Sequence, residues 1–148
     1  MTSFYGTESY AIDHKGRLAI PAEVRRPDGR KQPIKSFYLV AFFEGCLALY
    51  TPEQWNGVIE RVKRRSGGRK GRKFSRAFFN NVKEVPVDSQ GRVTIPSVLM
   101  SRAGLEREAV LHGLPDRVEI WNPKRHQAVM AEADSQFEEF GEEVFGGE

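Results

Sequence analysis

The chain has 148 residues, enough for one domain with a single hydrophobic core, and carries 23 Lys and Arg against 20 Asp and Glu. Its one cysteine, Cys46, excludes an internal disulfide and a cysteine-rich metal site. The first residues lack the pattern of a signal peptide and no apolar run is long enough to span a bilayer, so we expect a cytoplasmic protein without a membrane partner.

The first half of the chain alternates short strands with helices. Four strands are predicted from apolar or alternating runs bounded by turn residues, over residues 8–13, 17–20, 36–43 and 46–50. Gly16 supplies the positive φ that the turn between the first two strands requires, and Pro21 begins a helical turn. Thr51, with Gln54 three residues later, makes the pattern of a capping box, which predicts a helix that ends near Arg65.

A basic, glycine-containing segment follows, and it reads K-R-R-S-G-G-R-K-G-R-K over residues 63–73. We expect a flexible arm whose cations contact phosphate in an accessory role, namely Lys63, Arg64, Arg65, Arg69, Lys70, Arg72 and Lys73. The alternative is a solvated linker, because such charge runs usually are. The segment lacks the G-K-[ST] ending of a phosphate-binding loop, and Ser75 is the expected N-cap of the next helix.

The second half repeats the plan of the first. The prediction is a strand that ends at residue 88, a strand over 92–95, a short helix over 97–103, strands over 108–111 and 118–121, and a helix from Pro123. No Lys or Arg lies from His126 onward, where seven acidic side chains gather, so residues 1–125 carry a net charge of +10. A basic body with an acidic tail indicates a surface that binds a polyanion. The tail could be disordered or could fold back as a helix.

The similarity between the halves is an internal repeat. Residues 10–25 read Y-A-I-D-H-K-G-R-L-A-I-P-A-E-V-R, and residues 85–100 read V-P-V-D-S-Q-G-R-V-T-I-P-S-V-L-M. These segments align with an offset of 75 residues, and residues 41–58 align with 112–129 at an offset of 71. The first copy therefore has four extra residues, which we place in the loop at residues 26–35. A small unit used twice is typical of a binding surface.

Each copy places an arginine directly after a turn glycine. Arg17 and Arg92 begin strands, so each guanidinium is carried on a short, strand-anchored side chain. Arginine can bind phosphate or a guanine edge through two hydrogen bonds, which lysine cannot do. We therefore expect both arginines to contact DNA. The simpler alternative is that each arginine only pairs with the aspartate of its own turn.

The aspartates and glycines of the two turns have a different predicted role. Because Asp13 and Asp88 are acidic, they are not expected to touch DNA. Instead they accept hydrogen bonds from turn amides or from the arginine four residues later, and so fix its direction. Gly16 and Gly91 complete these turn-organising residues.

The tips of the two turns differ in chemistry. The first presents His14 and Lys15, whose cationic character suits phosphate, while the second presents Ser89 and Gln90. Glutamine can read an adenine edge in the major groove. The sequence therefore predicts DNA contacts by His14, Lys15 and Gln90, with the second tip the more base-specific of the two.

An enzyme is not indicated. The three histidines show no metal-ligand spacing, and no nucleophile with an adjacent base or cofactor loop is apparent. We expect no cofactor, no metal and no small-molecule substrate.

Four motifs taken together resemble the MraZ family of bacterial transcriptional regulators: S-F-x-G near the start, D-x-K-G-R-L-x-I-P-A, D-S-Q-G-R-V-x-I-P and V-E-I-W. Each half resembles the AbrB/SpoVT swapped-hairpin DNA-binding domain. The resemblance covers roughly residues 3–130. It implies a mainly β fold with helices, of the α+β class, in which two hairpin copies in one chain interleave into a β-barrel. It also implies a ring-like homo-oligomer, associated with the nucleoid, whose D-x-x-x-R segments face promoter DNA. The family acts on the division and cell-wall gene cluster, commonly as a repressor.

The expected organisation is a first repeat over residues 3–62, a basic linker and helix over 63–83, a second repeat over 84–130 and an acidic tail over 131–148. Two other functions stay open. An antitoxin-like regulator would bind its promoter and a toxin, although that group usually carries one hairpin copy per chain. An RNA-binding protein would stack single-stranded bases on its aromatic side chains. A preference for duplex DNA distinguishes the regulator from the RNA-binding protein.

Overall fold

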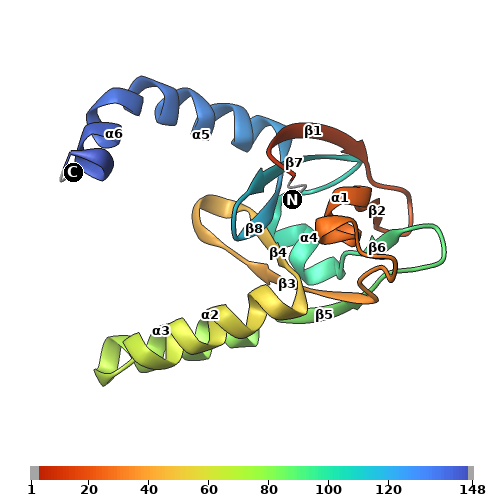
Figure 1. Ribbon diagram of the computed structural model, residues 1–148, viewed down its shortest axis with the longest axis horizontal. Coiled ribbons are helices and arrows are strands. Elements are labelled where there is room, and N and C mark those ends of the chain that lie inside the picture. Colours follow the sequence, from red (N-terminus) through yellow and green to blue (C-terminus); the bar gives the residue numbers. More distant parts are fainter. Residues whose placement is uncertain (1–3, 147–148) are drawn as a thin grey trace.

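The structure is a computed structural model that describes residues 4–146 and combines strands with helices, which confirms the predicted α+β class. The expectation of a mainly β chain is wrong, because helices take up more of these residues than strands do. Its elements are β1 (Gly6–Ala11), β2 (Arg17–Ala19), α1 (Ala22–Arg25), β3 (Ser36–Ala41), β4 (Leu47–Tyr50), α2 (Pro52–Arg65), α3 (Gly68–Asn80), β5 (Val82–Pro86), β6 (Arg92–Thr94), α4 (Ser97–Ala103), β7 (Glu108–Leu114), β8 (Arg117–Trp121), α5 (Pro123–Ser135) and α6 (Phe137–Phe145). Each repeat has the order strand, strand, helix, strand, strand, helix, and α3 and α6 follow the first and the second repeat (Figure 1).

Most strand pairing joins one repeat to the other. A six-stranded antiparallel sheet has the order β1-β7-β8-β4-β3-β5, and β2 pairs with β6 in a separate two-stranded sheet. Within a repeat, only the hairpins β3–β4 and β7–β8 form ladders in the part of the chain that the structure describes. This exchange is the interleaving that the family resemblance implies. The strand pairs among residues 4–146 do not include one between β1 and β5, which are the two edges of the six-stranded sheet.

The hairpin turn expected between the first two strands is present, but the two strands pair only next to it. Ile12 and Leu18 form a single bridge, and the amide of Asp13 donates to the carbonyl of Arg17 at 3.1 Å. Beyond this point β1 pairs with β7 and β2 pairs with β6. A two-stranded hairpin has little stability alone, since it cannot bury its apolar side chains. The exchange solves this problem: Leu18 lies directly opposite Val93, and both side chains are fully buried.

The core lies between the two sheets and on both faces of β4. Leu47 and Leu49 belong to the main apolar cluster, which also contains Leu18, Val93 and Leu99. Side chains of successive strand residues point to opposite faces. Ala48 and Tyr50 accordingly belong to a second cluster on the other face.

The second cluster fixes α2 and α3 to the body as a helical hairpin. Thr51 caps α2 through the predicted capping box with Gln54. Trp55 of α2 stacks on Tyr38 of β3 at 5.4 Å and on Phe78 of α3 at 5.9 Å between ring centroids. These three rings join the helical hairpin to the sheet.

Two predictions for the basic segment are wrong. Residues 63–73 are helical apart from Ser66 and Gly67, so the segment is not a flexible arm, although it is mostly exposed and connects the two repeats. The second helix begins at Gly68 with Gly67 as its N-cap, and Ser75 lies inside it. The aromatic packing described above outweighs the low helix propensity of the glycines, which explains why the local sequence misled the prediction.

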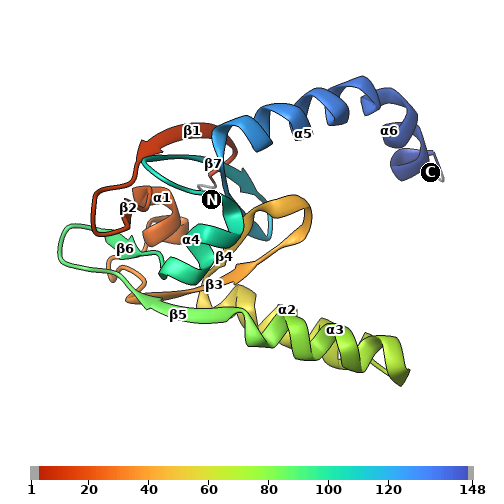
Figure 2. The ribbon, with the colours of Figure 1, turned by 180° about the vertical axis from the view of Figure 1, so that it is seen from behind.

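The acidic tail is helical as far as the structure describes it. Asn122 caps α5 through hydrogen bonds from the amides of Lys124 and Arg125. Helices α5 and α6 form an arm that leaves the body on the same side as α2 and α3, and the two arms end apart from each other (Figures 1 and 2). Among residues 4–146, no helix is both long enough and apolar enough to cross a membrane.

The buried contact between β2 and β6 leads to a test of stability. Leu18→Ala removes a fully buried side chain and should lower the free energy of unfolding by about 2–5 kcal/mol. The control Val98→Ala alters a side chain that is 58% exposed and should change it by less than about 0.5 kcal/mol. Urea denaturation measures both, and equal effects of the two substitutions would contradict the proposed place of Leu18 in the core.

Candidate nucleic-acid interface

The first loop is organised by the carboxylate of Asp13. Its Oδ1 accepts hydrogen bonds from the backbone amides of Lys15 at 2.9 Å and Arg17 at 2.8 Å. Its Oδ2 accepts one from Nε of Arg17 at 2.6 Å. Aspartate commonly binds the amide two residues later in this way at turns. The same carboxylate therefore shapes the loop and holds the guanidinium of Arg17.

The second loop repeats this geometry. Oδ1 of Asp88 accepts hydrogen bonds from the backbone amides of Gln90 at 2.8 Å and Arg92 at 2.9 Å, and its Oδ2 accepts one from Nε of Arg92 at 3.1 Å. Both donors considered from the sequence, the turn amides and the arginine four residues later, thus bind each aspartate. An arginine held through Nε still has its terminal N–H groups available as donors.

The two loops are joined to each other. The amide of Ile20 donates to the carbonyl of Gly91 at 3.0 Å, and the amide of Ile95 donates to the carbonyl of Gly16 at 2.9 Å. A terminal nitrogen of Arg92 also lies 3.7 Å from Oδ2 of Asp13, the atom that binds Arg17. Arginines that are 75 positions apart in sequence therefore meet at one carboxylate, at the end of the body opposite the tips of the two arms (Figures 1 and 2).

Glycine is required at the same place in both loops. Gly16 has φ 78° and Gly91 has φ 79°, a region that other residues rarely adopt. A Cβ on Gly16 would lie 3.2 Å from the carbonyl oxygen of Ile95, and a Cβ on Gly91 would lie 3.0 Å from the guanidinium of Arg25. The close approach of the first loop to Ile95 therefore depends on Gly16, and Gly91 leaves room for the guanidinium of Arg25.

Side-chain exposure differs between the tips and the arginines. His14, Lys15 and Gln90 are exposed at the tips of the loops. The side chains of Arg17 and Arg92 are 28% and 25% exposed, so each guanidinium is held by its aspartate and still reaches solvent. The five predicted contact residues thus lie on two adjacent loops.

The electrostatics of the loops keep both aspartates ionised. The hydrogen bond from the backbone amide of Arg17, supported by the side chain of Arg17 and the amide of Lys15, lowers the pKa of Asp13 to about 2. The corresponding hydrogen bonds, led by the amide of Arg92, lower the pKa of Asp88. Both carboxylates therefore orient their arginines throughout the physiological pH range.

One residue near the loops was missed from the sequence. Arg25 of α1 donates from Nε to the carbonyl of Ile20 at 2.8 Å, and its guanidinium lies against Gly91 of the second loop. Arg25 aligns with Met100 in the other repeat. A basic residue at a position that is apolar in the second copy was the sequence signal that could have indicated its role. Arg25 thus places a further guanidinium against the second loop.

The accessory basic residues do not join this cluster. Lys63, Arg64 and Arg65 end α2, and Arg69, Lys70, Arg72 and Lys73 lie on α3. Figures 1 and 2 show α3 and the end of α2 on the opposite side of the body from β2 and β6. These seven cations therefore form a separate surface.

Two of the three histidines, His112 and His126, lie together near α5, whereas His14 is at the tip of the first loop. Nδ1 of His112 lies 2.9 Å from Nε2 of His126, and burial together with the proximity of His112 lowers the pKa of His126. Within residues 4–146, no group of three or more His, Cys, Asp or Glu side chains is arranged to hold a metal ion.

The positive φ of Gly16 leads to a second test. Gly16→Ala should lower the free energy of unfolding by about 1–2 kcal/mol because alanine disfavours this backbone region. Gly57→Ala, at an open position in α2, should instead raise it by up to about 1 kcal/mol because alanine favours helix. Chemical denaturation measures the free energy of unfolding of both variants. A change of the same sign in both would contradict the requirement for glycine at position 16.

The low pKa of Asp13 leads to a test by pH. The pKa of Asp13 in the folded protein, about 2, lies below the ordinary value of 3.8. Ionised Asp13 therefore stabilises the fold fully at pH values above 3.8, and this stabilisation is lost as the pH falls towards 2. Between about pH 4 and pH 2, the free energy of unfolding should fall more steeply for the wild type than for Asp13→Asn. Asp88 titrates in both proteins, so its contribution cancels in the comparison. If the free energy of unfolding fell equally with pH in both proteins, the stabilising role of ionised Asp13 would be contradicted.

Comparison with known proteins identifies the family. Residues 3–72 and 78–146 match the family described as "MraZ protein, putative antitoxin-like". Proteins named transcriptional regulator MraZ are similar over 95% of this chain: those of Ligilactobacillus salivarius, 34% identical with 96% of that protein covered, Heliobacterium modesticaldum, 36% with 96%, and Pelotomaculum thermopropionicum, 37% with 94%. With the duplicated Asp-x-x-Gly-Arg loops, these matches show that the chain belongs to the MraZ family.

Proposed function

We propose that this protein is a transcriptional regulator that binds double-stranded DNA sequence-specifically through the paired loops at residues 13–17 and 88–92. The observation that carries the proposal is the shared carboxylate: Arg17 binds Oδ2 of Asp13 at 2.6 Å, and Arg92 lies 3.7 Å from the same atom. Arginines held in this way are preorganised for a ligand with two adjacent acceptors, such as a phosphate or a guanine edge. The names of the relatives support transcription as the process that is regulated.

The two loops form one DNA-contacting surface whose two tips contact different parts of the DNA. Lys15 at the exposed tip of the first loop suits phosphate, which positions the protein, and Gln90 at the exposed tip of the second suits adenine, which specifies sequence. A net charge of +10 over residues 1–125 attracts the polyanion. The protein does no chemistry on DNA in this account and acts by occupying a promoter.

A single pair of loops offers few contacts, so affinity requires several protomers. We propose a ring-like homo-oligomer whose protomers engage repeated promoter elements together, which raises the effective concentration of each further loop pair. Repression of the division and cell-wall gene cluster, in the cytoplasm at the nucleoid, follows from the family resemblance. We further propose that residues 3–62 and 84–130 are the two repeats, and that their interleaved strands close into a β-barrel.

The function is tested by fluorescence anisotropy across a salt series. The ligands are duplex DNA from upstream of the protein's own operon, a scrambled duplex and single-stranded RNA of the same length. Each specific arginine contact contributes about 1–3 kcal/mol, so Arg17→Ala/Arg92→Ala should lose the preference for the native duplex. The matched control Arg64→Ala/Arg69→Ala removes the same charge from the α2–α3 arm and should keep that preference.

The outcomes separate the candidate functions. A wild type that prefers the native duplex, together with a loop variant that does not, supports the regulator. Equal binding of all duplexes with the same salt dependence in both variants would contradict it, because the basic charge alone would then account for binding. Tighter binding to single-stranded RNA would favour an RNA-binding protein. In Lys15→Gln and Gln90→Lys, an unchanged sequence preference would contradict the different roles of the two tips.

A further inference from the structure

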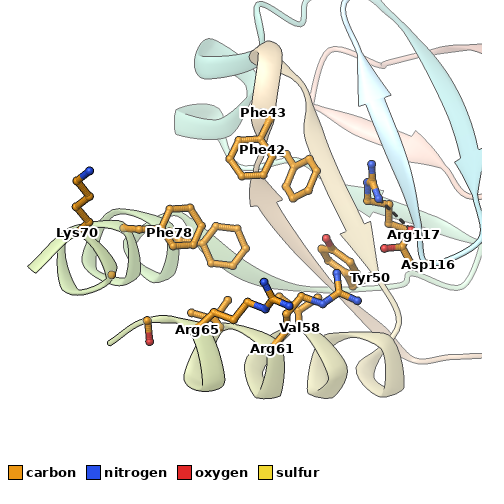
Figure 3. Close-up of a pocket in the computed structure, with 14 residues that line it drawn as sticks. Phe42, Phe43, Tyr50, Val58, Arg61, Arg65, Lys70, Phe78, Asp116 and Arg117 are labelled. Atoms are coloured by element: carbon orange, nitrogen blue, oxygen red, sulfur yellow. Dashed lines mark hydrogen bonds and ion pairs between the residues drawn. The ribbon is translucent and has the colours of Figure 1, made fainter. Parts of the chain in front are cut away.

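A groove lined by aromatic side chains lies between the α2–α3 arm and the body, on the far side from the loops. It encloses about 410 Å³ and is bounded by α2, α3, the β3–β4 turn and the β7–β8 turn. Phe43 and Phe74 stack across it at 6.3 Å, and Phe74 stacks on Phe78 at 5.2 Å. Phe43 is 57% exposed and Phe74 is 40% exposed. Figure 3 shows Phe42, Phe43 and Phe78 along the groove.

The rim of the groove is basic. Arg61, Arg65 and Lys70 border it, and all three are exposed (Figure 3). In the described part of the chain, none of the three forms an ion pair with a carboxylate. Residues 61–76 contain nine basic and no acidic side chains. The groove therefore offers an apolar floor and positive charge to an occupant.

Helix α6 has the opposite character. Its apolar residues fall on one helical face and are mostly exposed: Phe137 by 74%, Phe140 by 49%, Val144 by 78% and Phe145 by 70%. Residues 126–146 contain six acidic and no Lys or Arg side chains. A contiguous exposed apolar face of this kind marks an interaction site.

We infer that α6 of one protomer docks in the aromatic groove of a neighbouring copy of the same chain. The occupant and the groove match in both apolar character and charge: phenylalanines meet an aromatic floor, and glutamates meet unpaired arginines and lysine. No residue of α5 or α6 lines the groove of its own chain. This inference deepens the proposed function, since it rests on the self-association proposed there and names its surfaces.

The geometry of the contact predicts the form of the assembly. The two surfaces differ and lie on separate arms that project from the same side of the body (Figures 1 and 2). Contact between unlike surfaces repeats from copy to copy and closes into a ring when the rotation allows. The loops that carry Arg17 and Arg92 lie at the other end of the body, so they stay free for DNA.

Charge reversal tests the contact by analytical ultracentrifugation without DNA. Arg61→Glu/Arg65→Glu makes the groove acidic, and Glu138→Lys/Glu142→Lys makes one flank of α6 basic. Each variant alone should sediment as a single protomer of 16.8 kDa, because its like charges repel. An equimolar mixture of the two should recover the wild-type mass, since each groove then meets an α6 of opposite charge. Circular dichroism checks that each variant keeps its helices.

The controls reverse equal charge outside the two surfaces. Arg64→Glu/Lys73→Glu lies on the α2–α3 arm but does not line the groove. Asp134→Lys/Glu139→Lys changes one residue of α5 and one residue of α6 that is not part of its apolar face. Both should keep the wild-type mass. A monomeric wild type, variants that keep its mass, or a mixture that stays monomeric would each overturn the inference.

The mass measurement is independent of DNA, so the two proposals fail separately. A wild type that prefers its own duplex but whose mass is unaffected by the groove and α6 variants contradicts this contact alone. A mass that responds as expected, in a protein without duplex preference, contradicts the proposed function and leaves the contact in place.

Discussion

The crossed pairing of β2 and β6 is the constraint on which the rest of the structure depends. Each of these strands has three residues, and each loop is joined to the end of the opposite strand by a hydrogen bond, from Ile20 to Gly91 and from Ile95 to Gly16. The position of each loop therefore depends on the other. Because segments 75 residues apart in sequence must meet, forming this contact costs chain entropy. In return, the pairing holds the two arginines rigidly and buries the contact between Leu18 and Val93, which offsets this cost.

The duplication produced two arms that diverged in chemistry. The aromatic pair Tyr50 and Trp55, 5.6 Å apart, corresponds in the second repeat to Trp121 and His126, 5.8 Å apart. In the first repeat this cluster continues into Phe78, which anchors α3 as a second, basic helix against the body. In the second repeat it continues into a histidine pair, and α5 extends away with the acidic α6 (Figure 1). Helices α3 and α6, which follow the first and the second repeat, thus carry opposite charge, and this allows the α2–α3 arm of one copy to contact α6 of another.

Much of the fold could be predicted from the sequence because its signals are local. The capping box at Thr51 and the proline before each short helix gave the predicted starts of their elements. The exchange of strands could not be predicted from β2 itself, since a three-residue strand does not specify its partner. Only the family resemblance implied it. Residues 63–73 misled the prediction because the packing of α2 and α3 against the sheet is tertiary information. Within the site, the aspartate and arginine of each loop were placed correctly relative to each other, whereas Arg25 comes from a helix that no motif connects to Gly91.

The central claim is that the two loops bind DNA as one unit, and hydrogen exchange measured by mass spectrometry tests it most directly. Duplex DNA from upstream of the operon is added in steps, and amide protection is followed along the chain. The account predicts that peptides covering residues 10–20 and 85–95 gain protection together, at the same DNA concentration. Protection confined to one of these loops, or centred on residues 61–76 of the α2–α3 arm, would contradict it.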